Sequence, residues 1–506
     1  MLNQLLFKTV NLYPEKTAIV YDNRRMKYRE LYSQVIRFSK ALNLLNVKQD
    51  DCVAIILPNC PEFIISFYAI TQLKAIALPL NPAFKESEIS FYINDTAASV
   101  IITDLARSEV CRQVISQIDR KVELILVDGV TPSSLSFDTL IQKEINEFEE
   151  TATYEGYALY QYSSGTTEKP KRVCRTQKNI FHQANNTVST LNVTASDNIL
   201  CIVPMFHAYG FGECLLAATS TGATLVILEQ FIQDGVPVVM PFVFRCPRVL
   251  NLIENEKITI LPGVPYIYSI LAATPDQTPA DFSSLRLCIS AGNFLAKDTF
   301  DKFLKRFGIP IRQLYGCTEA GAVAINLSDP ADLPYDSIGW PMNNVEIKVM
   351  DDEGNELLPG VIGEFVIKSE TLIAEYNNLP EENFEAFKNG YFFTGDLGKK
   401  DEQNRLYLTG RKKMLIDTGG YKVNPIEIEA VLMTHPQVEE AVVVGIKGSL
   451  DGELIKAVIV IKGECEEQEI LSLCTAKLAD FKIPRIIEFR QKIPKNSLGK
   501  VLRSKV

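Results

Sequence analysis

Residues 162–171, Tyr-Ser-Ser-Gly-Thr-Thr-Glu-Lys-Pro-Lys, carry groups that could bind an anion. Four Ser or Thr hydroxyls, one glycine and two lysines lie within these ten residues, and apolar segments flank them. Gly165 allows backbone N–H groups to turn toward one point, while the hydroxyls donate hydrogen bonds and the lysines supply positive charge. The composition therefore predicts a phosphate-binding loop, although a polar surface hairpin would have the same composition.

Other familiar chemistries find little support in the chain. Its three histidines, His182, His207 and His435, leave few residues for a metal cluster or for a Ser–His or Cys–His triad. The patterns G-x-S-x-G, G-x-G-x-x-G and G-x-x-x-x-G-K-[ST] are absent. Common hydrolases, nicotinamide-dependent dehydrogenases and P-loop NTPases are therefore disfavoured.

Composition indicates a globular protein of more than one domain. The chain has 506 residues, 46% of them hydrophobic, and a net charge of −10, which argues against nucleic acid as the main partner. Its eleven cysteines are an odd number without a C-x-x-C pair, which favours a reducing compartment and argues against disulfides or structural zinc. No long apolar run or signal peptide is evident, so we expect a cytoplasmic protein without a transmembrane segment.

Hydrophobic periodicity predicts an α/β fold with layered parallel sheets. Helical patterns and short β-rich runs alternate, as in βαβ units. The predicted helices span residues 28–45, 62–73, 87–95, 210–219 and 248–256, and the predicted strands span 52–57, 75–80, 99–103, 198–203, 223–228 and 258–261. Residues 129–150 are predicted to be a polar connector. Residues 231–244 show no clear periodicity, and either a loop on the substrate side or an insertion fits them.

The C-terminal part has its own pattern. Predicted strands at 345–350 and 363–368 flank the turn Asp351–Gly354 and indicate a small β-subdomain. Further predicted strands span 441–444 and 455–461, and predicted helices span 425–434 and 467–478. We therefore predict a large domain over 1–410 and a small, mobile α+β domain over 411–506.

Five stretches, taken in order, resemble the adenylate-forming superfamily of acyl- and aryl-CoA synthetases, carrier-protein-loading adenylation domains and firefly-type luciferases. They are residues 162–171, Pro204–Gly210, Gln313–Glu319, Thr394–Asp396 with Gly410-Arg411, and Pro494–Lys500. The resemblance runs from about Ala18 to the C-terminus. It implies that a carboxylate attacks the α-phosphorus of ATP to give an acyl-adenylate and pyrophosphate. A thiol, from coenzyme A or a phosphopantetheinyl carrier protein, then displaces AMP.

The resemblance also implies roles for individual residues. Catalytic roles fall on Lys500, His207, Thr166 and Glu319, of which Glu319 would hold Mg²⁺ and Lys500 would bridge the carboxylate and phosphate oxygens. ATP or AMP would contact Ser163, Ser164, Gly165, Thr166, Thr167, Lys171, Ala291, Gly292, Asn293, Gln313, Tyr315, Gly316, Thr318, Asp396, Arg411, Lys422 and Lys500. The acid pocket would be lined by Phe206, His207, Tyr209, Val264, Ala291 and Cys317. Lys413 matches the hinge position, and Gly419, Gly420 and Tyr421 would line the thiol tunnel.

Each motif alone also has a structural explanation. Thr394–Asp396 could be a plain turn, Gly419-Gly420 a tight turn, His207 a hydrogen-bonded core histidine, and the C-terminal lysines a solvated end. In the phosphate loop, Glu168 and Arg172 stand where the family usually has small residues. We expect Glu168 to face solvent, because a carboxylate near a triphosphate weakens binding.

The sequence leaves the substrate and the acceptor partly open. Members that activate amino acids place an aspartate after the phenylalanine, whereas His207 follows Phe206 here, so an α-amino acid is disfavoured. Aryl, short-chain and medium-chain acids all remain possible. From Phe481 onward there are eight basic residues and one acidic residue, which could meet the 3′-phosphate of CoA or an acidic carrier protein. We expect CoA as the acceptor; a carrier-protein ligase and a non-catalytic nucleotide-binding relative are the alternatives.

Overall fold

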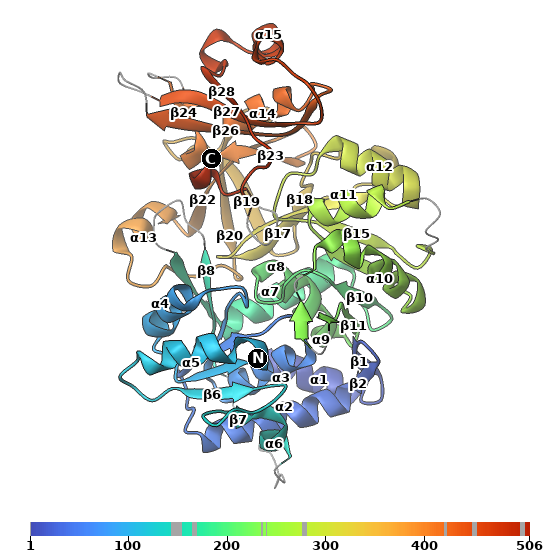
Figure 1. Ribbon diagram of the computed structural model, residues 1–506, viewed down its shortest axis with the longest axis vertical. Coiled ribbons are helices and arrows are strands. Elements are labelled where there is room, and N and C mark those ends of the chain that lie inside the picture. Colours follow the sequence, from blue (N-terminus) through green and yellow to red (C-terminus); the bar gives the residue numbers. More distant parts are fainter. Residues whose placement is uncertain are drawn as a thin grey trace. The chain divides into compact units, whose positions relative to one another are not determined.

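The computed structural model describes residues 2–142, 154–163, 170–233, 236–238, 240–275, 281–418, 422–447, 453–495 and 501–506. These residues form two compact units (Figure 1). The first unit comprises Met1–Glu346 and Lys368–Gly390, and the second comprises Ile347–Ile367 and Tyr391–Val506. The mixed α/β class predicted from periodicity is confirmed. The hinge and the domain boundary near Arg411 stay predictions.

The first unit contains two large sheets. One sheet has nine strands in the order β18 (Trp340–Pro341), β17 (Gly321–Ile325), β16 (Ile311–Cys317), β15 (Leu287–Ser290), β14 (Ile260–Gly263), β10 (Asn198–Cys201), β11 (Thr224–Ile227), β1 (Thr17–Tyr21) and β2 (Arg24–Lys27). The other has seven strands in the order β7 (Leu135–Ser136), β6 (Glu123–Leu126), β5 (Val100–Thr103), β3 (Cys52–Ile56), β4 (Ile76–Pro79), β8 (Tyr157–Ser163) and β9 (Lys171–Thr176). In the nine-stranded sheet, the run from β16 to β1 is parallel throughout.

Helices connect these strands, as parallel pairing requires. They are α1 (Leu2–Leu12), α2 (Tyr28–Leu44), α3 (Pro61–Gln72), α4 (Glu86–Thr96), α5 (Ser108–Ser116), α6 (Phe137–Ile141), α7 (Gln177–Leu191), α8 (Ala208–Gly210), α9 (Ala217–Thr221), α10 (Phe242–Asn255), α11 (Pro265–Ala273), α12 (Lys297–Phe307) and α13 (Pro380–Ala386). Short 3₁₀ turns are η1 (Leu105–Arg107) and η3 (Pro330–Asp332), and η2 (Phe211–Leu216) is a π-helix. Among the helices that the structure describes, none is long and apolar enough to cross a membrane.

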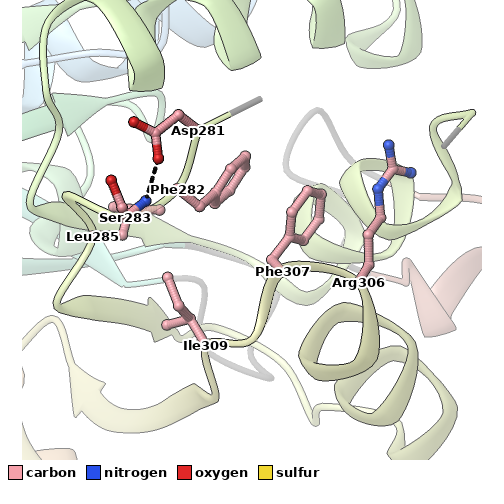
Figure 2. Close-up of a pocket in the computed structure, with 7 residues that line it drawn as sticks. All are labelled: Asp281, Phe282, Ser283, Leu285, Arg306, Phe307 and Ile309. Atoms are coloured by element: carbon pink, nitrogen blue, oxygen red, sulfur yellow. Dashed lines mark hydrogen bonds between the residues drawn. The ribbon is translucent and has the colours of Figure 1, made fainter. Parts of the chain in front are cut away.

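The C-terminal end of α12 packs against the segment before β15. The rings of Phe282 and Phe307 stack with their centroids 4.1 Å apart, and the backbone N–H of Ser283 donates to Asp281 at 2.8 Å. These residues, together with Leu285, Arg306 and Ile309, line a surface pocket of about 280 Å³ (Figure 2). None of the residues predicted for the active site lines this pocket, so it lies apart from the expected chemistry.

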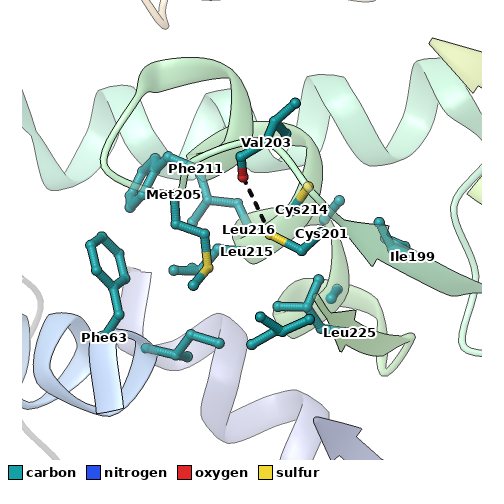
Figure 3. Close-up of a cluster of buried hydrophobic side chains, with 14 of the residues drawn as sticks. Phe63, Ile199, Cys201, Val203, Met205, Phe211, Cys214, Leu215, Leu216 and Leu225 are labelled. Atoms are coloured by element: carbon teal, nitrogen blue, oxygen red, sulfur yellow. Dashed lines mark hydrogen bonds between the residues drawn. The ribbon is translucent and has the colours of Figure 1, made fainter. Parts of the chain in front are cut away.

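The main core of the first unit contains side chains from both large sheets and from the helices packed on them. Figure 3 shows part of it, where Phe63 of α3, Ile199 and Cys201 of β10, and Leu215 of the π-helix are buried together. Fully burying one such side chain contributes about 1.5–3 kcal/mol. This core supports β10 and the turn after it, from which several predicted site residues come.

The second unit is built mostly on antiparallel strands, with one parallel pair in which residues 456–459 lie alongside residues 486–489. A five-stranded sheet has the order β19 (Val345–Met350), β20 (Gly363–Ser369), β22 (Tyr391–Lys400) and β21 (Phe387–Lys388), with β23 (Leu406–Arg411) paired to β22. Of these strands, β21 belongs to the first unit. A three-stranded sheet contains β26 (Val438–Lys447), β27 (Glu453–Ile461) and β28 (Ile486–Phe489), and β24 (Ile416–Asp417) pairs with β25 (Lys422–Val423). The helices are α14 (Pro425–Leu432) and α15 (Glu467–Lys477), with 3₁₀ turns η4 (Lys412–Met414), η5 (Asp480–Lys482) and η6 (Arg503–Lys505).

One sequence expectation needs correction, and the structure describes most of a second segment that the sequence left open. The segment 129–150 is more than a polar connector, because β7 and α6 lie within it. The ring of Phe137 in α6 packs against Phe38, with the two ring centroids 4.5 Å apart. Residues 143–150 lie outside the described residues. In the segment 231–244, β12 (Phe231–Gln233) pairs with β13 (Val236–Val238), and α10 begins at Phe242. Strands this short contain too few alternating apolar and polar residues to be recognised from hydrophobic periodicity.

Candidate active site

The predicted acid- and adenine-binding residues converge at one edge of the nine-stranded sheet. Residues 204–210 follow β10, Val264 follows β14, residues 291–293 follow β15, and β16 ends at Cys317. These four strands are neighbours and run parallel, so their carboxyl ends meet at the same edge. Ligands bind at this edge in open α/β sheets. Stretches separated by more than a hundred residues in sequence therefore lie at one edge of this sheet.

Several apolar residues predicted for the acid pocket are held in place by the sheet. Ala291 is buried, and a side chain on Gly292 would touch Val264 at 3.9 Å, which places these residues next to each other. Tyr209 donates its hydroxyl to the carbonyl of Ile289 in β15 at 2.8 Å, so its ring is held against the sheet. His207 is exposed and immediately precedes α8. An exposed position excludes the alternative that His207 is a core histidine.

Gln313 and Gly316 support the end of β16. Gln313 is buried, and its side-chain amide donates to the carbonyl of Tyr335 at 2.6 Å. The strand bulges between Tyr315 and Gly316, and a Cβ on Gly316 would lie 2.5 Å from the carbonyl oxygen of Gly321. Only glycine fits there, and the bulge leads the chain into Thr318 and Glu319 at the sheet edge.

The predicted phosphate loop connects β8 and β9. Ser163 and Lys171 lie opposite each other in the antiparallel register of these strands, so the ends of the loop are brought together. The intervening residues Ser164, Gly165, Thr166, Thr167 and Glu168 lie outside the described residues. The side-chain amide of Gln161 donates to the carbonyl of Phe206 at 3.4 Å, which ties this hairpin to the acid pocket.

Tyr376 connects the hairpin to Glu319, although sequence analysis did not single it out. Its hydroxyl donates to Glu319 Oε1 at 2.8 Å, and the Lys171 ammonium lies 4.9 Å from the centre of its ring. The backbone of Tyr376 also pairs with Val173 of β9. Tyr376 therefore orients the buried carboxylate beside the phosphate hairpin. In the sequence, only its position within a polar segment ahead of Pro380 could have drawn attention to it.

Arg172, one of the two unusual residues of the loop, is directed away from it. Its guanidinium donates to the carbonyl of Asp95 at 2.9 Å, lies 3.6 Å from the Asp95 carboxylate and lies 5.1 Å from the Tyr160 ring centre. Tyr162 donates its hydroxyl to the same carboxylate. Arg172 therefore links β9 to α4 through these contacts with Asp95.

Behind Glu319 lies a buried polar group made by Arg175, Gln183 and Glu213. Arg175 is fully buried, donates to Gln183 Oε1 at 2.5 Å and to the carbonyl of Thr371 at 3.2 Å. Burial lowers the pKa of Arg175 to about 10, although the nearby Cys317, Glu213 and Glu319 oppose this shift. Burial also raises the pKa of Glu213 to about 8, against hydrogen bonding from Thr187 and the charge of Arg175. Glu213 is therefore largely protonated at neutral pH.

In the second unit, Asp396 and Arg411 form a cross-strand pair. They lie opposite each other in β22 and β23, and the guanidinium donates to both carboxylate oxygens, through Nε to Oδ1 and at 3.4 Å to Oδ2. Gly395 has a φ of +72°, and the Thr394 hydroxyl accepts from the Asp396 backbone N–H at 3.0 Å. Thr394–Asp396 is therefore not a plain turn but an irregularity within β22, where the register with β20 shifts, and it carries a buried carboxylate.

Other predicted residues of the second unit are only partly described. Lys413 is exposed within η4, and Lys422 begins β25. Lys500 and Gly419, Gly420 and Tyr421 lie outside the described residues. Four of the eight C-terminal basic residues form ion pairs within the unit: Lys482 with Glu427, Arg490 with Glu488, Lys495 with Glu440 and Arg503 with Glu429. Much of this positive charge is therefore neutralised locally.

Comparison with known families agrees with this arrangement. Residues 6–377 match the AMP-binding enzyme family, and residues 427–500 match the AMP-binding enzyme C-terminal domain. The chain belongs to the AMP-binding enzyme family. The superfamily resemblance predicted from the five stretches is thereby confirmed.

Similar proteins cover nearly the whole of this AMP-binding enzyme. A long-chain-fatty-acid–CoA ligase of Bacillus subtilis (strain 168) is 29% identical, over 100% of this chain and 94% of the relative. The 4-coumarate–CoA ligase 3 of Oryza sativa subsp. japonica is 31% identical, over 94% of this chain and 86% of the relative. The crystal structure of an anthranilate CoA ligase in complex with anthranoyl-AMP is similar with a TM-score of 0.87 and 28% identity, covering 99% of this chain and 95% of that one.

These relationships define the type of enzyme. It is an AMP-forming acid–thiol ligase of the acyl-CoA synthetase type, so the expectation of a ligase is confirmed. The named relatives act with coenzyme A, which does not favour the carrier-protein alternative. The non-catalytic alternative is likewise not favoured.

The buried Glu213 predicts an unusual dependence of stability on pH. Its pKa is about 8 in the native enzyme, against an ordinary value of 4.5 in the unfolded chain. Between these values the native state keeps a proton that the unfolded chain releases, so the free energy of unfolding falls as pH rises. Glu213→Gln imitates the protonated form and should remove this loss of unfolding free energy. The loss amounts to about 1.4 kcal/mol per pKa unit, and to several kcal/mol over the pH range between the two pKa values.

Urea unfolding of the full chain at about pH 5 and about pH 9 measures this difference. The control is Glu385→Gln, at an exposed glutamate of α13, which should leave the pH dependence unchanged. Equal pH dependence in the wild type and Glu213→Gln would contradict a raised pKa at this position.

Proposed function

We propose that this enzyme converts an apolar carboxylic acid, ATP and coenzyme A into an acyl-CoA thioester, AMP and pyrophosphate, through an acyl-adenylate. The observation that carries the proposal is the meeting of four stretches at the carboxyl edge of the nine-stranded sheet, beside the β8–β9 hairpin. The acid, the adenine and the triphosphate would thereby be held next to one another. Positioning like charges in this way is the main task of the first half-reaction.

The acid is an aryl or alkyl carboxylic acid without an α-ammonium group. The pocket residues Phe206, Tyr209, Val264, Ala291 and Cys317 offer no carboxylate to an amine, and His207 would face the carboxylate of the substrate. The relatives named above act on a long-chain fatty acid, on 4-coumarate and on anthranilate, which supports an acyl or aryl substrate. Short- and medium-chain acids remain within this class.

In the first unit, the nucleotide would be held by the hairpin and by the end of β16. Ser163, Lys171 and the loop between them would bind the β- and γ-phosphates. Thr318 would contact the α-phosphate, while residues 291–293, Tyr315 and Gly316 would enclose adenine. Gln313, whose amide binds the Tyr335 carbonyl, would act by supporting this strand rather than by direct contact.

Glu319 has the chemistry expected of a magnesium ligand. It offers a buried carboxylate with one oxygen oriented by Tyr376, and hard oxygen donors suit Mg²⁺. When bound, Mg²⁺ would neutralise negative charge on the phosphates.

In the second unit, Asp396 would accept the ribose hydroxyls while Arg411 orients it. Lys500 would bridge the acid and the α-phosphate in the first half-reaction, with Lys422 assisting. Rotation about Lys413 would then withdraw Lys500 and bring Gly419, Gly420 and Tyr421 to the thiol.

A two-stage assay tests this function. Acid-dependent exchange of pyrophosphate into ATP is measured across alkyl, aryl and α-amino acids, and the active acid is then offered coenzyme A or a holo-carrier protein. We expect exchange with apolar acids and a thioester with CoA. Preference for an α-amino acid would contradict the assigned acid class, and a thioester on the carrier alone would contradict the assigned acceptor.

A further inference from the structure

Three metal-binding side chains meet at one place in the second unit, apart from the residues assigned to acid activation. They are His435, Cys465 and Glu469, and their ligand atoms all lie within 4.8 Å of one another. The Cys465 sulfur lies 4.0 Å from His435 Nδ1. Zn–S and Zn–N bonds are about 2.3 and 2.1 Å, so a sulfur and a nitrogen on one ion lie no more than about 4.4 Å apart, and the distance between Cys465 and His435 meets this limit.

The backbone that presents these side chains is well supported. His435 lies in the turn between α14 and β26, and Cys465 lies between β27 and α15. The two turns are joined where the backbone N–H of Lys462 donates to the carbonyl of Gln437 at 2.9 Å. Leu432 of α14 and Ile470 of α15 are both buried in one apolar core. The three donors are therefore attached to a common rigid base.

Local hydrogen bonds prepare the donors for a cation. The backbone N–H of Gln437 donates to His435 Nδ1 at 3.3 Å, which orients the ring, and a metal ion bound at this nitrogen would replace that hydrogen bond. The backbone N–H of Glu466 donates to Glu469 Oε2 at 3.0 Å, which fixes the carboxylate. An imidazole, a cysteine thiolate and a carboxylate are the donor types of zinc sites.

Charge also favours a cation here. The N-terminus of a helix carries partial positive charge and by itself would repel a metal ion. However, α15 starts with Glu466 at its N-cap and has Glu467 and Glu469 in its first turn. The three carboxylates outweigh the half-charge of the helix end, so a divalent cation is attracted.

We propose that His435, Cys465 and Glu469 bind one Zn²⁺ ion, with water in the fourth position. Binding releases the thiol proton of Cys465 to solvent, and the resulting thiolate donates its electron pair to the metal. The ion would link the α14–β26 turn to the start of α15. This differs from the cysteine-pair zinc sites that the sequence lacks, because His435 and Cys465 are 30 residues apart and no local motif reveals them.

Titration of the reduced full chain with Co²⁺, followed by competition with Zn²⁺, tests the proposal. We expect a thiolate-to-cobalt charge-transfer band that saturates at one equivalent and is removed by Zn²⁺. Cys465→Ser should abolish the band. Glu469→Gln and His435→Gln should weaken Zn²⁺ binding by more than about tenfold. Glu469→Gln is informative because glutamine can keep the helix-capping hydrogen bond.

Cys317→Ser is the matched control. Of the eleven cysteines, only Cys317 and Cys465 are not buried, and Cys317 lies near Glu319, the other candidate metal ligand. This variant should retain the band. Loss of the band in Cys317→Ser, its survival in Cys465→Ser, or unchanged Zn²⁺ affinity in Glu469→Gln would each overturn the proposal. Far-UV circular dichroism verifies that all variants are folded, and pyrophosphate exchange by the His435, Cys465 and Glu469 variants reports on acid activation separately from zinc binding.

Discussion

Lys500→Ala is expected to reduce acid-dependent ATP–pyrophosphate exchange by about 100- to 1,000-fold, while thioester formation from pre-made adenylate is retained. A lysine that bridges the carboxylate and the phosphate oxygens offsets the repulsion between two anions, and this help is needed only in the first half-reaction. Single-turnover measurement of each half-reaction separates the two effects. The purified acyl-adenylate, supplied with coenzyme A, isolates the second step.

Lys505→Ala is the matched control for this experiment. It removes the same charge from an exposed position of the same C-terminal segment, in η6. We expect it to leave both half-reactions within about twofold of wild type, since exposed charges interact weakly. An equal loss of both half-reactions in Lys500→Ala would show that Lys500 acts on folding or on domain position instead.

Glu319→Gln is expected to lower pyrophosphate exchange by about 100-fold or more and to raise the Mg²⁺ concentration needed for half-maximal rate. Glutamine keeps an oxygen that can accept a hydrogen bond from the Tyr376 hydroxyl, so the structure around position 319 should be retained. It lacks the negative charge that a magnesium ligand supplies, and such charge stabilisation is worth several kcal/mol. Exchange rates measured across a Mg²⁺ series separate metal affinity from the maximal rate.

Tyr376→Phe is the comparison for this variant. It removes only the hydroxyl that orients Glu319, and the loss of one hydrogen bond to a charged group costs about 1.5–3 kcal/mol. We therefore expect a loss of about tenfold to 100-fold in exchange, with a smaller change in Mg²⁺ dependence than in Glu319→Gln. If neither variant alters the Mg²⁺ requirement, Glu319 is not a metal ligand.

Regular elements were the easiest part to predict. The helix expected at 28–45 is α2, and the strand expected at 52–57 is β3, because a long amphipathic period and a buried apolar run are strong local signals. The helix expected at 210–219 instead contains a π-helix over Phe211–Leu216, which places Glu213 among buried residues. Hydrophobic periodicity does not distinguish α from π hydrogen bonding, so this difference was invisible in the sequence.

Site residues were predictable where chemistry and spacing are local. Asp396 and Arg411 were both expected at the nucleotide, yet their direct pairing depends on the register of β22 and β23. Tyr376 was not expected, because its role arises from contacts with Lys171 and Glu319, both distant in the chain. Register and packing are decided by the whole sheet, which a linear motif does not contain.

The sequence by itself determined the α/β class, the order of the five motifs and, through them, the two-step chemistry of an acid–thiol ligase. The loop at 162–171 was recognisable because its hydroxyls, glycine and lysines are consecutive. Only the tertiary structure decided that Arg172 binds Asp95, that Glu319 rests against Tyr376, and that His435, Cys465 and Glu469 meet. The physical reason is that adjacent residues share a backbone and therefore a local conformation, whereas distant side chains meet only when burial of the apolar core brings their elements together.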